Sequence, residues 1–511
     1  MGIGATAGVA VVGGTALNAN ASDSTSSPSL SSDALAFDPD GYTELTTTIT
    51  DADGADHDVT YHFWKAVTYV TDPVDATYQS LVVSVPVEID GTAVDATDAP
   101  ILFANGVEGY LPFTVSAAAG IAGGTAVGLP PGAGGNVSLP KLGLAAGYVV
   151  VEPGARGWSL TDSSGTYYGT APSGIVDLKA AVRYVRANKG VMPGNTDRIV
   201  STGTSAGGAL SSLLGASGDS PIYDVYLKEL GAADASDAVF ATGAWCPITD
   251  LEHADGAYEF CWGSNPLNGG KTVDATVSRT LQAQFAEYQA SLKLKGLNGF
   301  GPLHARNLDD YLLETYIQPS ATTYLTDLSA AARETYLAAN TFIAWSGGRA
   351  AFTWADYLTH VGARKKNAPA FDTFDLSAVE NHEFGKGTTA ARHFTAYGAK
   401  NDTTGLTSRR LDSDIAEKLR LMNPMHHLVE KVNPNRSKHW WIRLGTKDSD
   451  TSLTVAANLA AAVDNLGDDV NHLYYWDQGH GANTDPGDFI TWVAKVTGHK
   501  GKRSVRNGRG G

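Results

Sequence analysis

The chain has 511 residues, of which 43% are hydrophobic and 18% are charged, and its formal net charge is −17. This is the composition of a globular protein with enough apolar material for a large core. The negative charge argues against a nucleic-acid or anionic-membrane partner, since both bind basic surfaces.

The N-terminus has the pattern of an export signal. Residues 3–17 are uncharged and largely apolar, and Ala19-Asn20-Ala21 follows as an A-x-A cleavage motif. The run is too short to span a bilayer, and no Lys or Arg precedes it, so we expect a signal truncated at its start. Residues 1–35 are assigned to this remnant and a Ser-rich linker. The predicted location is extracellular, without stable membrane insertion.

Strands alternate with helices on both sides of a long central stretch. The hydrophobic pattern predicts strands over residues 79–87, 99–104, 147–151 and 198–202, with helices over 175–188 and 206–214. It then predicts strands over 440–444 and 473–476, with helices over 453–466 and 489–496. This alternation indicates an α/β fold with a parallel sheet flanked by helices on both faces.

The central stretch breaks that rhythm and is predicted to be an inserted lid domain. It is rich in aromatic residues and in charged helical segments such as 277–295. A compact domain does not need so long a connection between sheet strands. We expect a core formed by residues 36–246 and 426–500, a lid over 247–425 and a disordered basic tail over 501–511.

The only two cysteines are Cys246 and Cys261. An exported chain meets oxidising conditions, so they could form a disulfide, and a pair of buried free thiols is equally compatible with the sequence. Neither has the neighbouring His or Cys spacing of a zinc motif. No metal or organic cofactor is expected.

The motif Gly203-Thr204-Ser205-Ala206-Gly207 matches G-x-S-x-G. It follows a predicted strand and precedes a predicted helix, which is the strand–turn–helix context of a nucleophile elbow. Glycine suits both flanking positions because the turn is tight. We therefore expect Ser205 to be a nucleophile, with the backbone N–H of Ala206 receiving a developing oxyanion.

A serine nucleophile needs a histidine base, and the base needs an orienting carboxylate. The candidates lie on loops after the two late strands, at the edge of a parallel sheet where active sites form. His480 follows the last strand, and Asp448 and Asp450 follow the strand before it. Either aspartate could orient the imidazole, and Asp477 is a weaker third candidate.

The second oxyanion donor is expected in the loop after an early strand. The segment 105–110 follows the strand over 99–104 and offers the backbone N–H of Gly106 or of Gly109. The pattern does not distinguish between these two glycines.

Taken together, these segments resemble the bacterial tannases, a branch of the α/β-hydrolases. The resemblance spans about residues 40–497 and covers both the core and the insertion. It rests on Gly203-Thr-Ser-Ala-Gly-Gly-Ala-Leu-Ser-Ser212 and Cys246-Pro-Ile-Thr-Asp-Leu-Glu-His253, and on residues 147–154, 175–184, 368–372, 423–425, 448–450 and 479–481. A shared hydrolase core alone would not produce matches inside the insertion.

The resemblance implies a catalytic triad and a binding site for the galloyl ring. Asp448, the first aspartate of the D-S-D pair, becomes the expected triad acid. Asp450, Lys366 and Glu380 match the positions that hold the galloyl hydroxyls, with Lys365 an immediate competitor for Lys366. Phenolic hydroxyls both donate and accept hydrogen bonds, so carboxylates and an ammonium suit them.

Two apolar positions complete the implied site. Ile248 matches a residue that packs on the galloyl ring, and Val379 stands where the family usually has proline. The sequence thus predicts a secreted serine esterase that cleaves galloyl esters of hydrolysable tannins, through a galloyl-enzyme. Its alternatives are a feruloyl or broader aryl carboxylesterase with the same triad and an exported binding protein on a hydrolase fold. The oligomeric state is left open.

Overall fold

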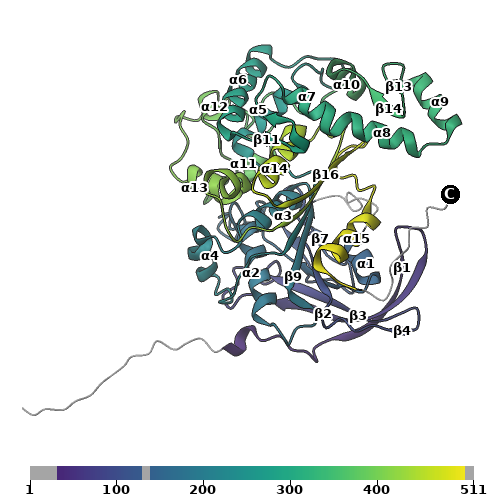
Figure 1. Ribbon diagram of the computed structural model, residues 1–511. Helices are drawn as coiled ribbons and strands as arrows, with labels where there is room; N and C mark the ends of the chain where they lie inside the picture. The colour runs from purple at the N-terminus through teal and green to yellow at the C-terminus, as the bar shows by residue number, and fades with distance from the viewer. Residues whose placement is uncertain (1–31, 129–137, 501–511) are drawn as a thin grey trace, which may run out of the picture.

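A mixed ten-stranded sheet forms the centre of the molecule in the computed structural model, which describes residues 32–128 and 138–500 (Figure 1). The predicted signal over 3–17 and the tail over 501–511 lie outside the described residues. Along the sheet the strands are β1 (Thr43–Thr50), β2 (Asp56–Thr68), β3 (Ser80–Ile89), β8 (Val149–Pro153), β5 (Pro100–Ala104), β9 (Asn195–Thr204), β10 (Ala241–Trp245), β15 (His439–Gly445) and β16 (Asp469–Tyr475), and β4 (Thr92–Ala93) pairs with β3.

The sheet is parallel in one half only. Every pairing from β8 through β5, β9, β10 and β15 to β16 is parallel, as the sequence predicted. The prediction is wrong for the other half, where β1, β2, β3 and β8 pair antiparallel. For β1 and β2 the reason is local: residues 51–55 form a tight turn, closed by the Asp51 N–H donating to Ala55 O at 2.8 Å, and a turn this short returns the chain antiparallel.

Helices cover both faces of the parallel half. On one face lie α2 (Ser173–Ala187), α3 (Ala206–Ala216) and α4 (Asp224–Glu229), and on the other lie α1 (Leu139–Ala145) and α15 (Pro486–Thr497) (Figure 1). Strands β5, β8 and β10 are buried along their whole length. Helix α2 buries Leu178, Val182 and Val185 at helical spacing, and each such side chain contributes roughly 1.5–3 kcal/mol. This packing holds the carboxyl ends of the parallel strands in place.

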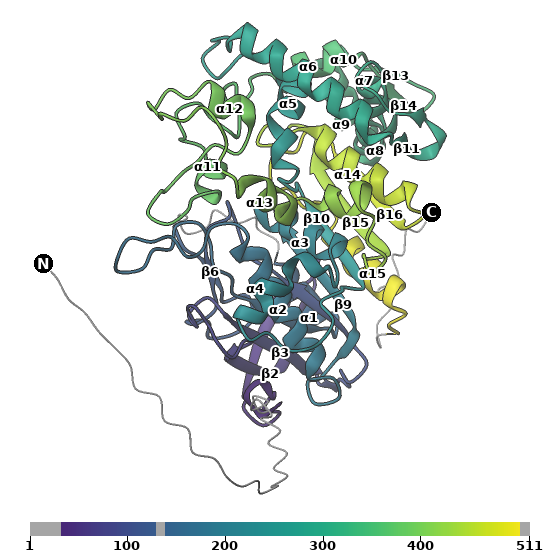
Figure 2. The same cartoon turned by 90° about the vertical axis from the view of Figure 1, so that its left-hand side faces the viewer.

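A long insertion separates two neighbouring strands. The chain leaves the sheet after β10 and returns at β15, which pairs with it from Ala241 and His439 onward. The sequence analysis missed β10 itself, and the predicted lid limits at 247 and 425 remain a prediction. Between them lie α5 (Leu251–Trp262), α6 (Ala275–Leu292), α7 (Leu308–Leu312), α8 (Gln318–Asp327), α9 (Ala330–Ala339), α10 (Trp354–Val361), α11 (Val379–Glu383), α12 (Ala396–Lys400) and α13 (Ile415–Met422). Figures 1 and 2 place this insertion at the end of the molecule opposite β1–β4.

Hydrogen bonds join helix α5 to the segment between β15 and α14 (Leu453–Asn465). The Tyr258 hydroxyl donates to Ser449 O at 2.7 Å, and the indole N–H of Trp262 donates to Thr451 O at 2.9 Å. Both cysteines are buried and free, so the alternative without a disulfide is the correct one. None of the helices in the described part of the chain has the length and hydropathy needed to cross a bilayer.

Candidate active site

Ser205 sits on a strained turn between β9 and α3. Its φ of 59° and ψ of −122° lie outside the regions that non-glycine residues favour. A Cβ on Gly203 would lie 2.2 Å from Gly207 O, and a Cβ on Gly207 would lie 2.6 Å from Val107 O. Side chains at these positions therefore collide with backbone. Such a turn has the backbone geometry of the nucleophile elbow that the motif predicts.

Three predicted residues meet at the carboxyl ends of β9, β15 and β16. His480 Nε2 lies 2.9 Å from Ser205 Oγ, and His480 Nδ1 lies 2.8 Å from Asp448 Oδ2. Asp448 is fully buried, and its other oxygen accepts the Asp450 N–H at 2.9 Å. A carboxylate, an imidazole and a hydroxyl in this order can transfer the serine proton.

The structure places the two competing aspartates elsewhere. Asp450 Oδ1 lies 2.6 Å from Lys365 Nζ. Asp477, with φ of 58°, points to His360 Nε2 at 2.6 Å and to Lys447 Nζ at 3.0 Å. The pKa of Asp477 is lowered to about 2, because hydrogen bonds from His360 and other neighbours outweigh burial, which alone would raise it. Asp448 is therefore the aspartate that contacts the imidazole of His480.

Opposing effects set the pKa of His480. Burial lowers this pKa, whereas the negative charge of Asp448 and the hydrogen bond to it raise it, and the net effect is a raised pKa. Glu108 adds another carboxylate near the imidazole: burial raises the pKa of Glu108, and the charge of His480 lowers it. The sequence analysis missed Glu108, although it lies within the loop selected for the second oxyanion donor.

That loop packs directly on the nucleophile turn. The Asn105 side chain donates to Thr202 O at 2.9 Å and to Gly207 O at 3.1 Å, which fixes the loop against β9 and α3. Gly106 follows immediately, and a Cβ there would lie 2.4 Å from the Phe113 ring. Gly109 has φ of 57°, and its carbonyl accepts the Trp158 indole N–H at 2.9 Å. The role of either glycine as a second donor stays a prediction, as does that of Ala206, the first residue of α3.

The predicted ring-binding residues fall into two ion pairs and an apolar contact. Lys366 Nζ lies 3.7 Å from Glu380 Oε1, whereas Asp450 is paired with Lys365. Glu380 is buried, and the Lys365 side chain is 60% exposed. Buried Ile248 donates its N–H to Ser205 O at 3.3 Å and so lies beside the nucleophile. These arrangements leave the choice between the two lysines to experiment.

Tyr258 and Tyr110 also hold this region together, and neither was predicted from the sequence as a site residue. The hydroxyl of Tyr258 accepts the Lys366 N–H at 3.1 Å and donates to Ser449 O, so it links the lysines to the Asp448–Asp450 segment. The hydroxyl of Tyr110 donates to Ile248 O at 2.7 Å. Val379, the first residue of α11, is 39% exposed. Tyr110 ends the selected 105–110 loop, but no sequence signal marked Tyr258.

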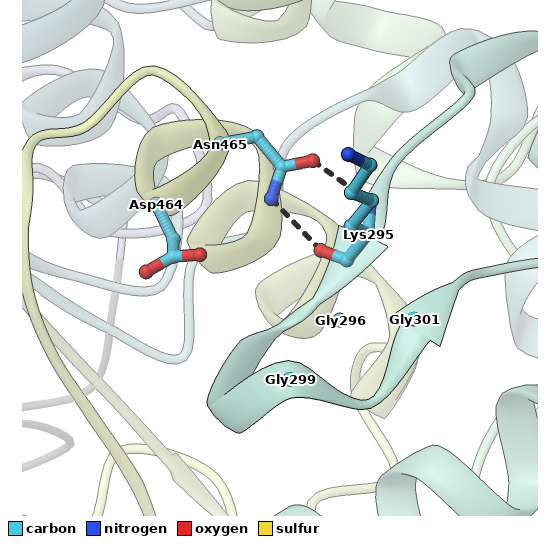
Figure 3. A pocket seen from close by; sticks show the side chains of 6 residues that line it. All are labelled: Lys295, Gly296, Gly299, Gly301, Asp464 and Asn465. Carbon is cyan, nitrogen blue, oxygen red and sulfur yellow. Dashed lines mark hydrogen bonds between the residues drawn. The ribbon is translucent and has the colours of Figure 1, made fainter.

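A surface hollow lies away from these residues, between the C-terminal end of α14 and the segment from β11 (Lys295–Gly296) to β12 (Gly301–Pro302) (Figure 3). Its lining is Lys295, Gly296, Gly299, Gly301, Asp464 and Asn465. The Asn465 side chain accepts the Lys295 N–H and donates to Lys295 O, both at 2.8 Å. These hydrogen bonds join β11 to the C-terminal end of α14. The lining of the hollow includes none of the predicted site residues.

The chain is similar to one family profile and to several solved structures. The family profile described as BD-FAE matches residues 143–293. A search of curated proteins finds no match. A solved structure of tannin acyl hydrolase in complex with ethyl gallate is 33% identical and covers 91% of this chain and 99% of its own, with a TM-score of 0.77.

Two further solved structures are similar over the same extent. Tannase from Fusobacterium nucleatum is 33% identical, and so is tannin acyl hydrolase from Lactobacillus plantarum. Each covers 91% of this chain and 99% of its own, with a TM-score of 0.76. Coverage of 91% extends into the insertion as well as the core. The chain therefore belongs to the tannase family of the α/β-hydrolase fold and is a carboxylic ester hydrolase.

Proposed function

We propose that this enzyme is a secreted serine esterase that hydrolyses the galloyl ester bonds of hydrolysable tannins and gallate esters. The observation that carries the proposal is the continuous contact from Asp448 through His480 to Ser205, at 2.8 and 2.9 Å, on a strained nucleophile turn. A hydroxyl in this setting is an activated nucleophile for acyl transfer.

Acylation begins with the proton of Ser205. His480 Nε2 takes this proton while Oγ attacks the ester carbonyl, and Asp448 stabilises the imidazolium that forms. The N–H of Ala206, with that of Gly106 or Gly109, holds the oxyanion. As the carbonyl re-forms, the ester C–O bond breaks, and His480 gives its proton to the departing alcohol. The product is a galloyl ester of Ser205.

Deacylation repeats these steps with water. His480 takes a proton from a water molecule, whose oxygen attacks the acyl carbon of the galloyl-enzyme. When the bond to Ser205 Oγ breaks, His480 returns the proton to the serine, and gallic acid leaves. His480 gives up every proton that it accepts, so the triad returns to its starting protonation state.

The insertion and the core segment after β15 together supply recognition of the acyl group. We assign Lys366, Glu380 and Asp450 to the ring hydroxyls and Ile248 to the ring face. The backbone N–H of Ile248 donates a hydrogen bond to Ser205 O. This places the Ile248 side chain where it can line the acyl site beside the ester carbonyl. Similar solved structures are complexes of tannin acyl hydrolase with ethyl gallate and with 3,4-dihydroxybenzoate, which supports a phenolic acid as the acyl part.

A substrate series tests the acyl specificity. We expect methyl gallate to be cleaved with a kcat/KM at least about 10-fold above that of methyl ferulate and methyl benzoate, because unpaired buried polar groups cost roughly 1–3 kcal/mol each. Equal turnover of ferulate or benzoate would instead identify a broader aryl esterase.

A serine variant tests catalysis itself. Ser205→Ala should abolish hydrolysis of methyl gallate. The matched control is Ser212→Ala, which removes another buried serine of α3 whose hydroxyl donates only within the helix, to Gly208 O. Activity of Ser205→Ala equal to that of the Ser212→Ala control would refute the triad.

Export is a separate part of the proposal. It rests on the apolar run over 3–17 and the A-x-A motif at Ala19–Ala21. Expression of the gene with its natural upstream region, followed by activity measurements in medium and cells, tests it. Activity that stays entirely within the cells would contradict export.

A further inference from the structure

A buried thiol lies beside the triad, and the proposed reaction does not use it. Cys246 Sγ lies 3.9 Å from His480 Nε2 and accepts the Gly481 N–H at 3.3 Å. Cys246 directly follows β10, and its own N–H donates to Arg443 O at 2.7 Å. The sulfur is therefore held against the imidazole by the sheet on one side and the histidine loop on the other.

We propose that Cys246 Sγ and His480 Nε2 form a binding site for a thiophilic divalent cation such as Zn²⁺, and that the bound cation switches the esterase off. The inference rests on the proposed role of His480 as the base. Thiolate and imidazole together are ligands that zinc prefers, at about 2.3 Å and about 2.0–2.1 Å. Their separation of 3.9 Å leaves room for an ion between them at an obtuse angle.

Asp448 completes the arrangement without needing to touch the ion. Ligating histidines generally donate their second ring N–H to a carboxylate, which orients the ring and makes it a better ligand. His480 Nδ1 has this contact with Asp448 Oδ2 at 2.8 Å. Ligand atoms of Cys246, Asp448 and His480 all lie within 4.8 Å of one another, so the carboxylate charge also favours a cation there.

The structure also indicates what the cation would block. His480 Nε2 faces Ser205 Oγ at 2.9 Å, and its lone pair is the one that takes the serine proton. A cation on this nitrogen removes the base, and Ser205 Oγ or water can fill a remaining coordination position. On binding, the thiol proton passes to solvent and a sulfur–metal bond forms. No sequence spacing reveals this site, because its ligands follow two different strands, β10 and β16.

Metal titration of activity tests the inference. In metal-free buffer with methyl gallate, ZnCl₂ should inhibit the wild type, and EDTA should restore the rate. Cys246→Ala and the size-conserving Cys246→Ser should need at least about tenfold more ZnCl₂. The matched control is Cys261→Ala, which removes the other buried free thiol and should be inhibited like the wild type. Methyl gallate binds some metal itself, equally in every reaction.

A spectroscopic measurement separates this inference from the proposed function. Co²⁺ added to wild type and to Cys261→Ala should give a thiolate-to-metal absorption band in the near ultraviolet, and Cys246→Ser should lack it. The band is read without substrate, so it tests the site even if methyl gallate is not hydrolysed. Equal zinc sensitivity of Cys246→Ser and wild type, a wild type that zinc does not inhibit, or a band that survives in Cys246→Ser would overturn the proposal.

Discussion

His480 Nδ1 donates to Asp448 Oδ2 at 2.8 Å, and the second oxygen of Asp448 is held by the backbone N–H of Asp450. Both oxygens of this buried carboxylate are therefore occupied, and its charge is directed at the imidazole. This relationship makes the pH dependence of the enzyme a direct readout of Asp448.

Asp448→Asn should shift the acid limb of kcat/KM to lower pH and lower kcat by about 10⁴-fold. The base must be neutral to accept the serine proton, so activity rises as pH passes the pKa of His480. Asp448 raises that pKa, whereas burial alone lowers it. Without the carboxylate charge, deprotonation is complete at lower pH. The pH profile of methyl gallate hydrolysis checks this, and an acid limb that stays in place would contradict it.

Lys366→Met should raise KM for methyl gallate roughly 10–100-fold, and Lys365→Met should change it much less. Lys366 lies near buried Glu380, so its loss leaves a buried carboxylate uncompensated. Lys365 pairs with Asp450 from an exposed position, and such pairs contribute about 0–1 kcal/mol. Initial rates over a range of methyl gallate concentrations separate KM from kcat. The reverse order of effects would assign the ring hydroxyls to Lys365.

Gly207→Ala should reduce both stability and activity. The added Cβ would lie 2.6 Å from Val107 O, a backbone atom, and such overpacking costs about 1–3 kcal/mol. It would also push the loop of the proposed second oxyanion donor away from Ser205. The matched control is Gly174→Ala in α2, where the nearest atom would be 3.5 Å away and alanine favours the helix. Thermal unfolding and kcat measure the two effects, and equal behaviour of both variants would contradict the elbow geometry.

Arg364→Met should lower the free energy of unfolding by about 3–5 kcal/mol, because it leaves a buried carboxylate unpaired. Arg364 Nη1 donates to Glu259 Oε2 at 2.9 Å, Nη2 also contacts this carboxylate, and both side chains are fully buried. Urea unfolding measures the loss.

A matched surface pair provides the control for Arg364. Lys189→Ala breaks the exposed pair with Asp197 and should cost at most about 1 kcal/mol. Arg364 Nε also donates to Lys366 O at 2.8 Å, so KM for methyl gallate should rise in Arg364→Met as well. Unchanged stability and KM would mean that the buried pair is dispensable.

The parallel core was readable from the sequence because its strands are buried on both faces. Residues 149–151 and 100–104 form continuous apolar runs, and helix α2 repeats its apolar positions every three or four residues. Strand β1, by contrast, is the threonine-rich segment TELTTTIT, most of it exposed, and its weak alternation was not recognised as a strand. Strand β10 was not predicted from the sequence, because its residues ATGAW differ little in hydrophobicity from the residues around them.

The candidate active site also contains some residues that the sequence predicted and others that it did not. Ser205 and His480 follow strand ends and carry local motifs, so sequence position alone brought them together. The choice among Asp448, Asp450 and Asp477 depends on side-chain direction, which no spacing encodes. Cys246 and Tyr258 act through contacts between segments distant in the chain, such as Tyr258 with Ser449. The contacts of Cys246 form when the core sheet assembles, and those of Tyr258 form only once the insertion has packed on the core.

The insertion leaves the sheet after Trp245 and returns at His439. Because β10 and β15 are parallel neighbours, with Ala241 opposite His439 and Trp245 opposite Arg443, these two points lie at opposite ends of the paired strands. Both junction strands belong to the core sheet, so the segment between them can be exchanged as a module while the core is kept. An insertion from a related esterase, joined at these two points, would keep Ser205, Asp448 and His480 together with Asp450 of the core, and would bring its own counterparts of the other acyl-binding residues. The requirement is that the incoming helix at the position of α5 reproduces the hydrogen bonds to Ser449 and Thr451. Chimeras built at this junction are therefore a route to new acyl specificities.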